Sequence, residues 1–156
     1  GLNRPFAAEE WEFAGGKSLF DRARQEARES RIDGRPDILG SDIDARSIDL
    51  CKKHAKKAGV MVNWKVAPLK ELSTDKSGGL IVCNPPYGER MMEKREAEAL
   101  YREMRHKFDE LDNWQVSVIT AYRDFERIYG KRADKRRKLS NGGMVCTMYQ
   151  YFKRND

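Results

Sequence analysis

LIVCNPPYG, at residues 80–88, is the part of this 156-residue chain that most narrows the choice of fold. Residues 79–83 form a continuous apolar run, which is typical of a strand buried on both faces of a parallel sheet. The two prolines that follow fix their own φ angles and keep the residue before each of them extended. We therefore predict a stiff corner just beyond the carboxyl end of an inner strand, where open α/β sheets bind their ligands.

The side chains of this corner suit one kind of chemistry. The Asn84 side-chain oxygen and the Pro85 carbonyl can accept both hydrogens of an amine, while the Tyr87 ring stacks on a flat base. The nitrogen lone pair would then face an incoming methyl group, so we predict that Asn84, Pro85, Pro86 and Tyr87 form a site for methyl transfer to nitrogen. The alternative is an ordinary turn, because Asn, Pro and Gly dominate turns for local reasons.

Helices and strands alternate on both sides of the corner. Apolar residues at helical spacing predict helices at residues 17–31, 45–59, 93–111 and 123–130. Strand patterns occupy residues 38–40, 60–66, 79–83, 114–121, 136–140 and 144–152. This order predicts an α/β sheet built from parallel crossovers. Asn-Gly-Gly at 141–143 predicts that the last two strands form an antiparallel hairpin.

A second polar segment, GSDID at residues 40–44, separates a short strand from a helix. A carboxylate at the end of the second strand of a dinucleotide-type fold bonds ribose hydroxyls, and Asp42 has this placement. We therefore predict a cofactor-binding role for Asp42, with Asp44 beside it. The alternative is local, since Asp44 has the position of a helix N-cap and Asp42 that of a turn residue.

Positive charge is concentrated near the end of the chain, whose net charge is +6. A basic excess favours polyanionic partners, nucleic acid above all. Residues 131–138 contain six cations that phosphate contacts would explain, namely Lys131, Arg132, Lys135, Arg136, Arg137 and Lys138. A solvated charged face is the alternative meaning of such a run.

The composition excludes several classes of protein. With 36% charged residues, the chain has no apolar run long enough to span a membrane. Its three cysteines form no C-x-x-C pair, so we expect no metal site and a reducing, cytoplasmic setting.

The sequence starts at Gly1 with neither an initiator methionine nor a signal peptide, so we expect a piece of a longer protein.

Four motifs together resemble the THUMP-domain-containing bacterial rRNA guanine-N2 methyltransferases. These are GLNRPFAAEEW at 1–11, GSDID at 40–44, IVCNPPYGERM at 81–91 and KRRKLSNGGMVCTMYQYF at 135–152. NPPY alone is shared with DNA adenine and protein glutamine methyltransferases, whereas its combination with the other three motifs is much more specific. The resemblance covers nearly the whole chain.

The resemblance implies a Rossmann-like domain that binds S-adenosylmethionine and acts on the N2 amine of a guanine in large-subunit rRNA. By analogy with the family's motifs, Asp42 would hold the cofactor's ribose, and residues 84–87 would hold a flipped base. Glu89 and Arg90 would steady these residues or touch RNA. A protein glutamine or DNA adenine methyltransferase, and a non-catalytic RNA-binding module, remain the alternatives.

The sequence departs from the family in two places. Family members carry a strand and a glycine-rich cofactor loop ahead of the GLNRPF segment, and no segment here replaces them. That strand would be central, between the strands that end at Gly40 and Cys83, so we expect apolar edges on both neighbours. Ala67 and Pro68 stand where the family usually offers an acidic or amide side chain to adenine. We expect the carboxy-terminal part of one methyltransferase domain, without its THUMP domain and with little activity by itself.

Overall fold

The computed structural model describes residues 2, 4–32, 34, 37–88, 91–141 and 143–153. It divides the chain into two compact units, residues 1–66 and residues 67–156, which are described separately below. None of its described helices combines the length and the apolar character that crossing a bilayer requires. Glu89 and Arg90, which the resemblance placed near the corner, lie outside the described residues.

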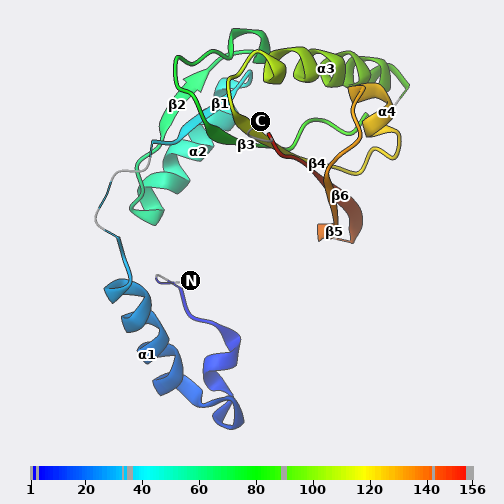
Figure 1. The fold of residues 1–156 in the computed structure, drawn as a ribbon. Helices are drawn as coiled ribbons and strands as arrows, with labels where there is room; N and C mark the ends of the chain where they lie inside the picture. Colours follow the sequence, from blue (N-terminus) through cyan, green and yellow to red (C-terminus); the bar gives the residue numbers. More distant parts are fainter. Residues whose placement is uncertain are drawn as a thin grey trace. The chain divides into compact units, whose positions relative to one another are not determined.

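The first unit contains a helical segment and a small parallel sheet (Figure 1). Its helices are η1 (Ala7–Glu10), η2 (Glu12–Ala14), α1 (Gly16–Glu29) and α2 (Ala45–Ala58), and its strands are β1 (Leu39–Asp42) and β2 (Asn63–Val66). The two strands pair in parallel, with Gly40 opposite Trp64. The Trp64 ring lies where a Cβ at position 40 would stand, so only glycine fits there.

The second unit is a four-stranded mixed sheet with helices. Its strands are β3 (Gly79–Cys83), β4 (Trp114–Thr120), β5 (Lys135–Asn141) and β6 (Met144–Tyr151), and its helices are η3 (Leu69–Glu71), α3 (Met91–Asp109) and α4 (Phe125–Tyr129). The strand order is β3-β4-β6-β5. Strands β3 and β4 are parallel and joined through α3, whereas β6 is antiparallel to both of its neighbours. The predicted α/β fold and terminal hairpin are confirmed.

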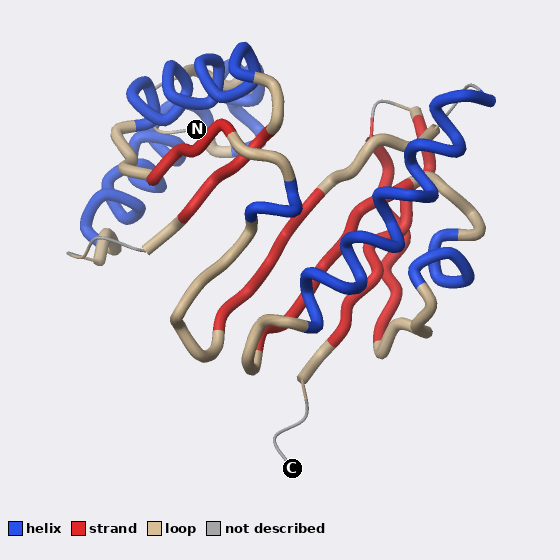
Figure 2. Tube along the Cα trace, turned by 90° about the horizontal axis from the view of Figure 1, so that it is seen from above, coloured by secondary structure: helices blue, strands red, loops and turns tan. Residues whose placement is uncertain are grey.

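An aromatic core joins α3 and α4 to one face of this sheet. Figure 2 shows the long helix α3 lying along that face. The Phe125 ring of α4 is fully buried, and its centroid is 5.0 Å from that of Tyr101 and 4.9 Å from that of Tyr149. The apolar residues whose spacing predicted a helix at 93–111 include Ala97, Tyr101, Met104 and Phe108, and these four lie in the core. Burial of these rings holds the helix against the strands.

Strand β3 is buried on one face only, so the prediction of a strand buried on both faces is wrong. Ile81 and Cys83 face the core, but Leu80 is 60% exposed and Val82 is 58% exposed. Successive side chains of a strand point to opposite faces, and the helices α3 and α4 cover only the face of Ile81. In the described part of the chain β3 pairs with β4 alone, and β1 pairs with β2 alone.

Some predicted boundaries are wrong by a few residues. Strand β2 begins at Asn63 rather than at residue 60. The reason lies in the end of α2, where Gly59 adopts a left-handed conformation and the Val60 N–H donates to the Ala55 carbonyl. Val60 therefore completes the helix terminus and cannot start the strand.

Candidate functional site

The corner that follows β3 carries the four residues predicted for catalysis. The Asn84 side chain is exposed, Pro85 is buried and Tyr87 is half-buried. The Tyr87 hydroxyl donates to Asn84 Oδ1 at 2.7 Å. A side-chain carbonyl has two lone pairs, so Asn84 Oδ1 can accept one further hydrogen. The structure thus brings Asn84 and Tyr87 into direct contact, which the sequence did not indicate.

A buried thiol lies behind the tyrosine. Cys146 of β6 is 1% exposed, and its Sγ donates to the Tyr87 hydroxyl at 3.7 Å. This contact is the main cause of a raised pKa at Tyr87, and burial adds to it. The phenol is therefore neutral at physiological pH and remains a donor to Asn84. Cys83, at the end of β3, is no nucleophile, because burial raises the pKa of its thiol to about 12.

The last residue of the corner packs closely on α3. Gly88 has φ +66°, and a Cβ there would stand 2.7 Å from Lys94 Cα and 3.1 Å from the Glu93 carbonyl oxygen. Both the left-handed backbone and the lack of space require glycine at this position. The corner is thus fixed at its far end by backbone contact with the first turns of α3.

A groove of about 360 Å³ opens between the corner and α3. It is lined by Pro86, Tyr87, Gly88, Glu93, Glu96, Ala97 and Leu100. Pockets for small planar ligands start at roughly 300 Å³, so the groove has room for one. Its glutamate carboxylates accept hydrogen bonds, which suits a ring that presents N–H donors.

The acidic turn belongs to the first unit. Asp42 ends β1, and its Oδ1 accepts from the Asp44 backbone N–H at 2.8 Å. Asp44 caps α2: its Oδ1 accepts from the Arg46 N–H at 2.9 Å, and its Oδ2 accepts from the Ser47 hydroxyl at 3.3 Å. The Asp44 side chain therefore caps α2, as its N-cap position predicted, and Asp42 Oδ1 holds the turn ahead of the helix.

The six cations of residues 131–138 are all exposed, but they do not form one surface. Register with β6 puts Lys135 and Arg137 on one face of the hairpin and Arg136 and Lys138 on the other. Arg136 Nη2 lies 2.7 Å from Glu126 Oε2 of α4, so this guanidinium is already paired inside the unit. Lys131 Nζ lies 5.8 Å from the centroid of the Tyr151 ring.

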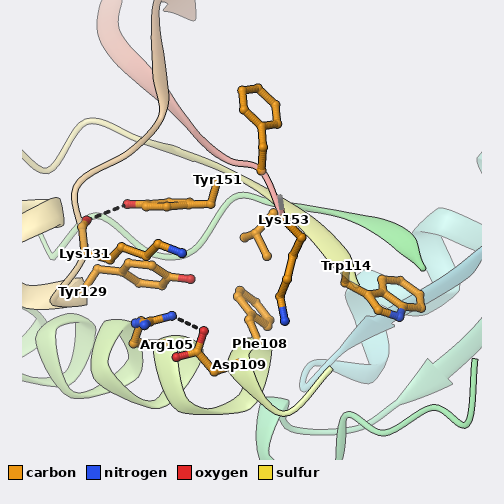
Figure 3. Close-up of a pocket in the computed structure, with 10 residues that line it drawn as sticks. Arg105, Phe108, Asp109, Trp114, Tyr129, Lys131, Tyr151 and Lys153 are labelled. Carbon is orange, nitrogen blue, oxygen red and sulfur yellow. Dashed lines mark hydrogen bonds and ion pairs between the residues drawn. The ribbon is translucent and has the colours of Figure 1, made fainter. Parts of the chain in front are cut away.

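A second cavity lies at the opposite end of β4, beside Trp114 (Figure 3). It measures about 20 Å³, which is room for a single water. Its charged groups are engaged with neighbours: Arg105 pairs with Asp109, and the Lys153 ammonium donates to the Leu111 carbonyl at 2.9 Å. We interpret this cavity as part of the packing. Among the described residues, no group of three or more His, Cys, Asp or Glu could hold a metal ion.

The strand order with its terminal antiparallel hairpin and the corner after β3 define an α/β domain of the methyltransferase type. Residues 1–150 match the family UPF0020, described as an RMKL-like methyltransferase domain. The chain belongs to this family, so the methyltransferase class implied by the resemblance is confirmed.

Two relatives share much of the sequence. YpsC of Bacillus subtilis strain 168, named as a candidate RNA methyltransferase, is 41% identical over 99% of this chain and 40% of its own length. Ribosomal RNA large subunit methyltransferase K/L of Legionella pneumophila strain Corby is 32% identical over 85% of this chain and 19% of its own length. The chain thus spans less than half the length of either relative.

Two solved structures are similar over the whole chain. SMU.472, a candidate methyltransferase in complex with SAH, is 37% identical with a TM-score of 0.86, over 100% of this chain and 42% of that one. A protein from Listeria monocytogenes strain 4b F2365, named as a predicted N6-adenine-specific DNA methylase, is 37% identical with a TM-score of 0.83, over 99% of this chain and 40% of that one.

Proposed function

We propose that this chain is the carboxy-terminal part of a methyltransferase domain that acts on the exocyclic N2 amine of a guanine in large-subunit rRNA. The observation that carries the proposal is the stiff corner with an exposed Asn84 amide held by Tyr87. Family membership supports methyl transfer. The names of the two relatives support an RNA acceptor, and the K/L name supports large-subunit rRNA. The cytoplasmic setting in the proposal rests on the cysteine pattern.

The corner would act by orienting the amine. Asn84 Oδ1 and the Pro85 carbonyl each accept one amine hydrogen, which directs the nitrogen lone pair away from the corner. Tyr87 keeps the Asn84 amide from rotating, because its hydroxyl donates to the same oxygen. As the N–C bond forms and the C–S bond of the donor breaks, the amine gains positive charge, and its surplus proton then leaves to solvent. The two acceptor oxygens stabilise that charge.

The methyl donor would be S-adenosylmethionine, which supplies an electrophilic methyl group when it is bound. Asp42 fits a ribose contact, since its side chain is exposed and its Oδ1 is fixed by the Asp44 N–H. Asp44 would contribute by capping α2 and holding Asp42 rather than by touching the cofactor. SMU.472 was solved with SAH, which supports this choice of donor.

We further propose that the same domain contains another strand and the glycine-rich cofactor loop. The strand pairing supports it, because within the described residues β1 pairs only with β2 and β3 only with β4, which leaves an edge of each strand for a further partner. An unpaired strand edge with exposed apolar side chains is otherwise a hazard for aggregation.

The cations of residues 131–138 would contact RNA phosphates, with Arg136 excepted because Glu126 holds it.

The proposal is tested with the protein that carries this chain at its full natural length. A methyl donor with a labelled methyl group is offered in parallel to unmodified large-subunit rRNA, genomic DNA and release factor. We expect label in the rRNA alone and, after digestion to nucleosides, in N2-methylguanosine. Label in adenine of the DNA would contradict the proposal.

The second candidate is a DNA adenine methyltransferase, which the name of the Listeria monocytogenes protein favours. The same corner could hold the N6 amine of adenine, so its geometry alone does not separate the two acceptors. The labelling experiment separates them, and it also separates both from a glutamine side chain in release factor. A non-catalytic RNA-binding module would label none of the three.

A further inference from the structure

We propose that Tyr101 and Thr120 are positioning residues of the site, which hold the corner through the carbonyl of Pro86. This inference rests on the proposed function. Neither residue lines the groove beside the corner: Tyr101 is fully buried in α3, and Thr120 is 1% exposed at the end of β4.

A chain of hydrogen bonds connects these residues to the corner. The Tyr122 backbone N–H donates to Thr120 Oγ1 at 3.1 Å. Thr120 Oγ1 lies 3.4 Å from the Tyr101 hydroxyl, which in turn donates to the Pro86 carbonyl at 2.7 Å. Because the Pro86 carbonyl can only accept, the proton of Tyr101 points toward it, and Thr120 supplies the proton between the two hydroxyls.

The Tyr101 hydroxyl is not needed for packing. Its ring makes edge contacts with Tyr122 and Phe125, with centroids 5.5 Å and 5.0 Å away, and a phenylalanine ring would make the same contacts. A buried hydroxyl is costly unless it is bonded, and here it is bonded to the corner. Burial raises the pKa of Tyr101, so the hydroxyl remains protonated and donates at physiological pH.

The corner depends on such carbonyl contacts. Pro85 and Pro86 have no N–H, so neither can be fixed by donating a backbone hydrogen bond. The Tyr101 hydroxyl fixes the peptide that joins Pro86 to Tyr87, while Cys146 and Asn84 hold the Tyr87 hydroxyl. Removal of the Tyr101 hydroxyl should therefore let the peptide rotate and displace Tyr87 and Asn84 together.

The experiment uses Tyr101→Phe in the full-length protein, with Tyr151→Phe as its matched control. Tyr151 is also a buried tyrosine whose hydroxyl donates to a backbone carbonyl, that of Lys131 at 3.2 Å, but it lies away from the corner. Thr120→Val removes the second hydroxyl of the chain, and Thr120→Ser restores it. Methyl-transfer kcat and KM, urea unfolding and the ¹³C shift of the Pro86 carbonyl are measured for each variant.

We expect Tyr101→Phe and Thr120→Val to lower kcat by about ten- to a hundredfold, because small displacements of positioned groups have effects of that size. KM for RNA should hardly change in these two variants, and Thr120→Ser should recover the kcat that Thr120→Val loses. The control Tyr151→Phe should lose as much stability as Tyr101→Phe while its kcat stays that of the wild type. A Tyr101→Phe variant with the kcat of the control, or with its loss entirely in KM, would overturn the inference.

The carbonyl shift separates this inference from the proposed function. The Pro86 ¹³C resonance should move in Tyr101→Phe and not in Tyr151→Phe, whether or not the protein methylates RNA. An unmoved resonance would refute the positioning role directly. If the wild-type protein transfers no methyl group but the resonance moves, the proposed function fails and the hydrogen-bonded support of the corner stands.

Discussion

The Asn84 side chain can orient a reacting amine only if rotation of its amide group is prevented. A free asparagine exchanges its oxygen and nitrogen by rotation about its last bond, and a donor to its oxygen prevents this. Tyr87 is that donor, and Cys146 holds Tyr87 in turn. Tyr87, three positions from Asn84 in the sequence, acts on this amide directly, and Cys146, fifty-nine positions beyond Tyr87, acts on it through Tyr87.

Gly88 is held both by its left-handed backbone conformation and by close contact with the backbone of α3. We expect Gly88→Ala to destabilise the protein by about 2–4 kcal/mol, since left-handed strain adds to a clash with the α3 backbone. Gly130→Ala is the control, because Gly130 also has a positive φ but no atom within 4 Å of an added Cβ. It should cost only about 1 kcal/mol. Urea unfolding measures both, and equal losses would show that close packing at Gly88 is unimportant.

At the scale of elements, most of the fold follows from local pattern. Glycine and proline positions and apolar spacing predicted both α-helices and all four strands of the second unit, but not the short helix η3. The NPPYG corner was predicted at the end of β3. The supports of the corner were not predicted, because Tyr101 reads only as one member of an apolar stripe and Cys146 as one residue of a strand. Both contacts depend on how α3 and β6 pack, which no local pattern shows.

The hairpin of β5 and β6 carries the cations proposed to contact RNA. We expect Arg137→Ala to weaken RNA binding equally for all sequences and to reduce the salt slope by about one, as loss of one phosphate contact does. Arg102→Ala removes the same charge from an exposed position on α3 and should change neither. Binding titrations over a range of salt concentrations check this. An unchanged slope for Arg137→Ala would mean that the hairpin faces solvent.

The tyrosines around α3, α4 and β6 make the free energy of unfolding change with pH in the alkaline range. Burial raises the pKa of Tyr129 and Tyr151. Burial is also the main cause that raises the pKa of Tyr122 to about 12, and the neighbouring Glu98 carboxylate adds to it. A raised pKa in the folded state stabilises the fold below the unfolded value, near 10, and the contribution is lost as pH rises through the folded pKa.

We therefore expect the free energy of unfolding to fall from about pH 10 to pH 12, as urea unfolding at several pH values would show. The fall should be shallower in Tyr122→Phe, because that variant has one phenol fewer to ionise. Stability that stays level or rises over this range would contradict the raised pKa values of these phenols in the folded state.

At the level of the whole molecule, we propose that β1 and β3, each paired with a single strand in the described part of the chain, pair further with another part of the same protein. The family match and the short coverage of the relatives agree with this proposal. Calorimetry on the 156-residue chain and on the full-length protein tests it. We expect much weaker S-adenosylmethionine binding by the shorter chain, whereas equal affinity would show that no further cofactor loop is needed.

The most direct test of the account is Asn84→Ala in the full-length protein, with Asn63→Ala, an exposed asparagine at the start of β2, as the control. The measurement is methyl transfer from labelled S-adenosylmethionine to unmodified large-subunit rRNA, with RNA affinity measured on the same samples. We predict that Asn84→Ala loses transfer by a factor of about 100 or more while both variants bind RNA like the wild type. Transfer by Asn84→Ala at the rate of the control would contradict the claim that the corner after β3 holds the reacting amine.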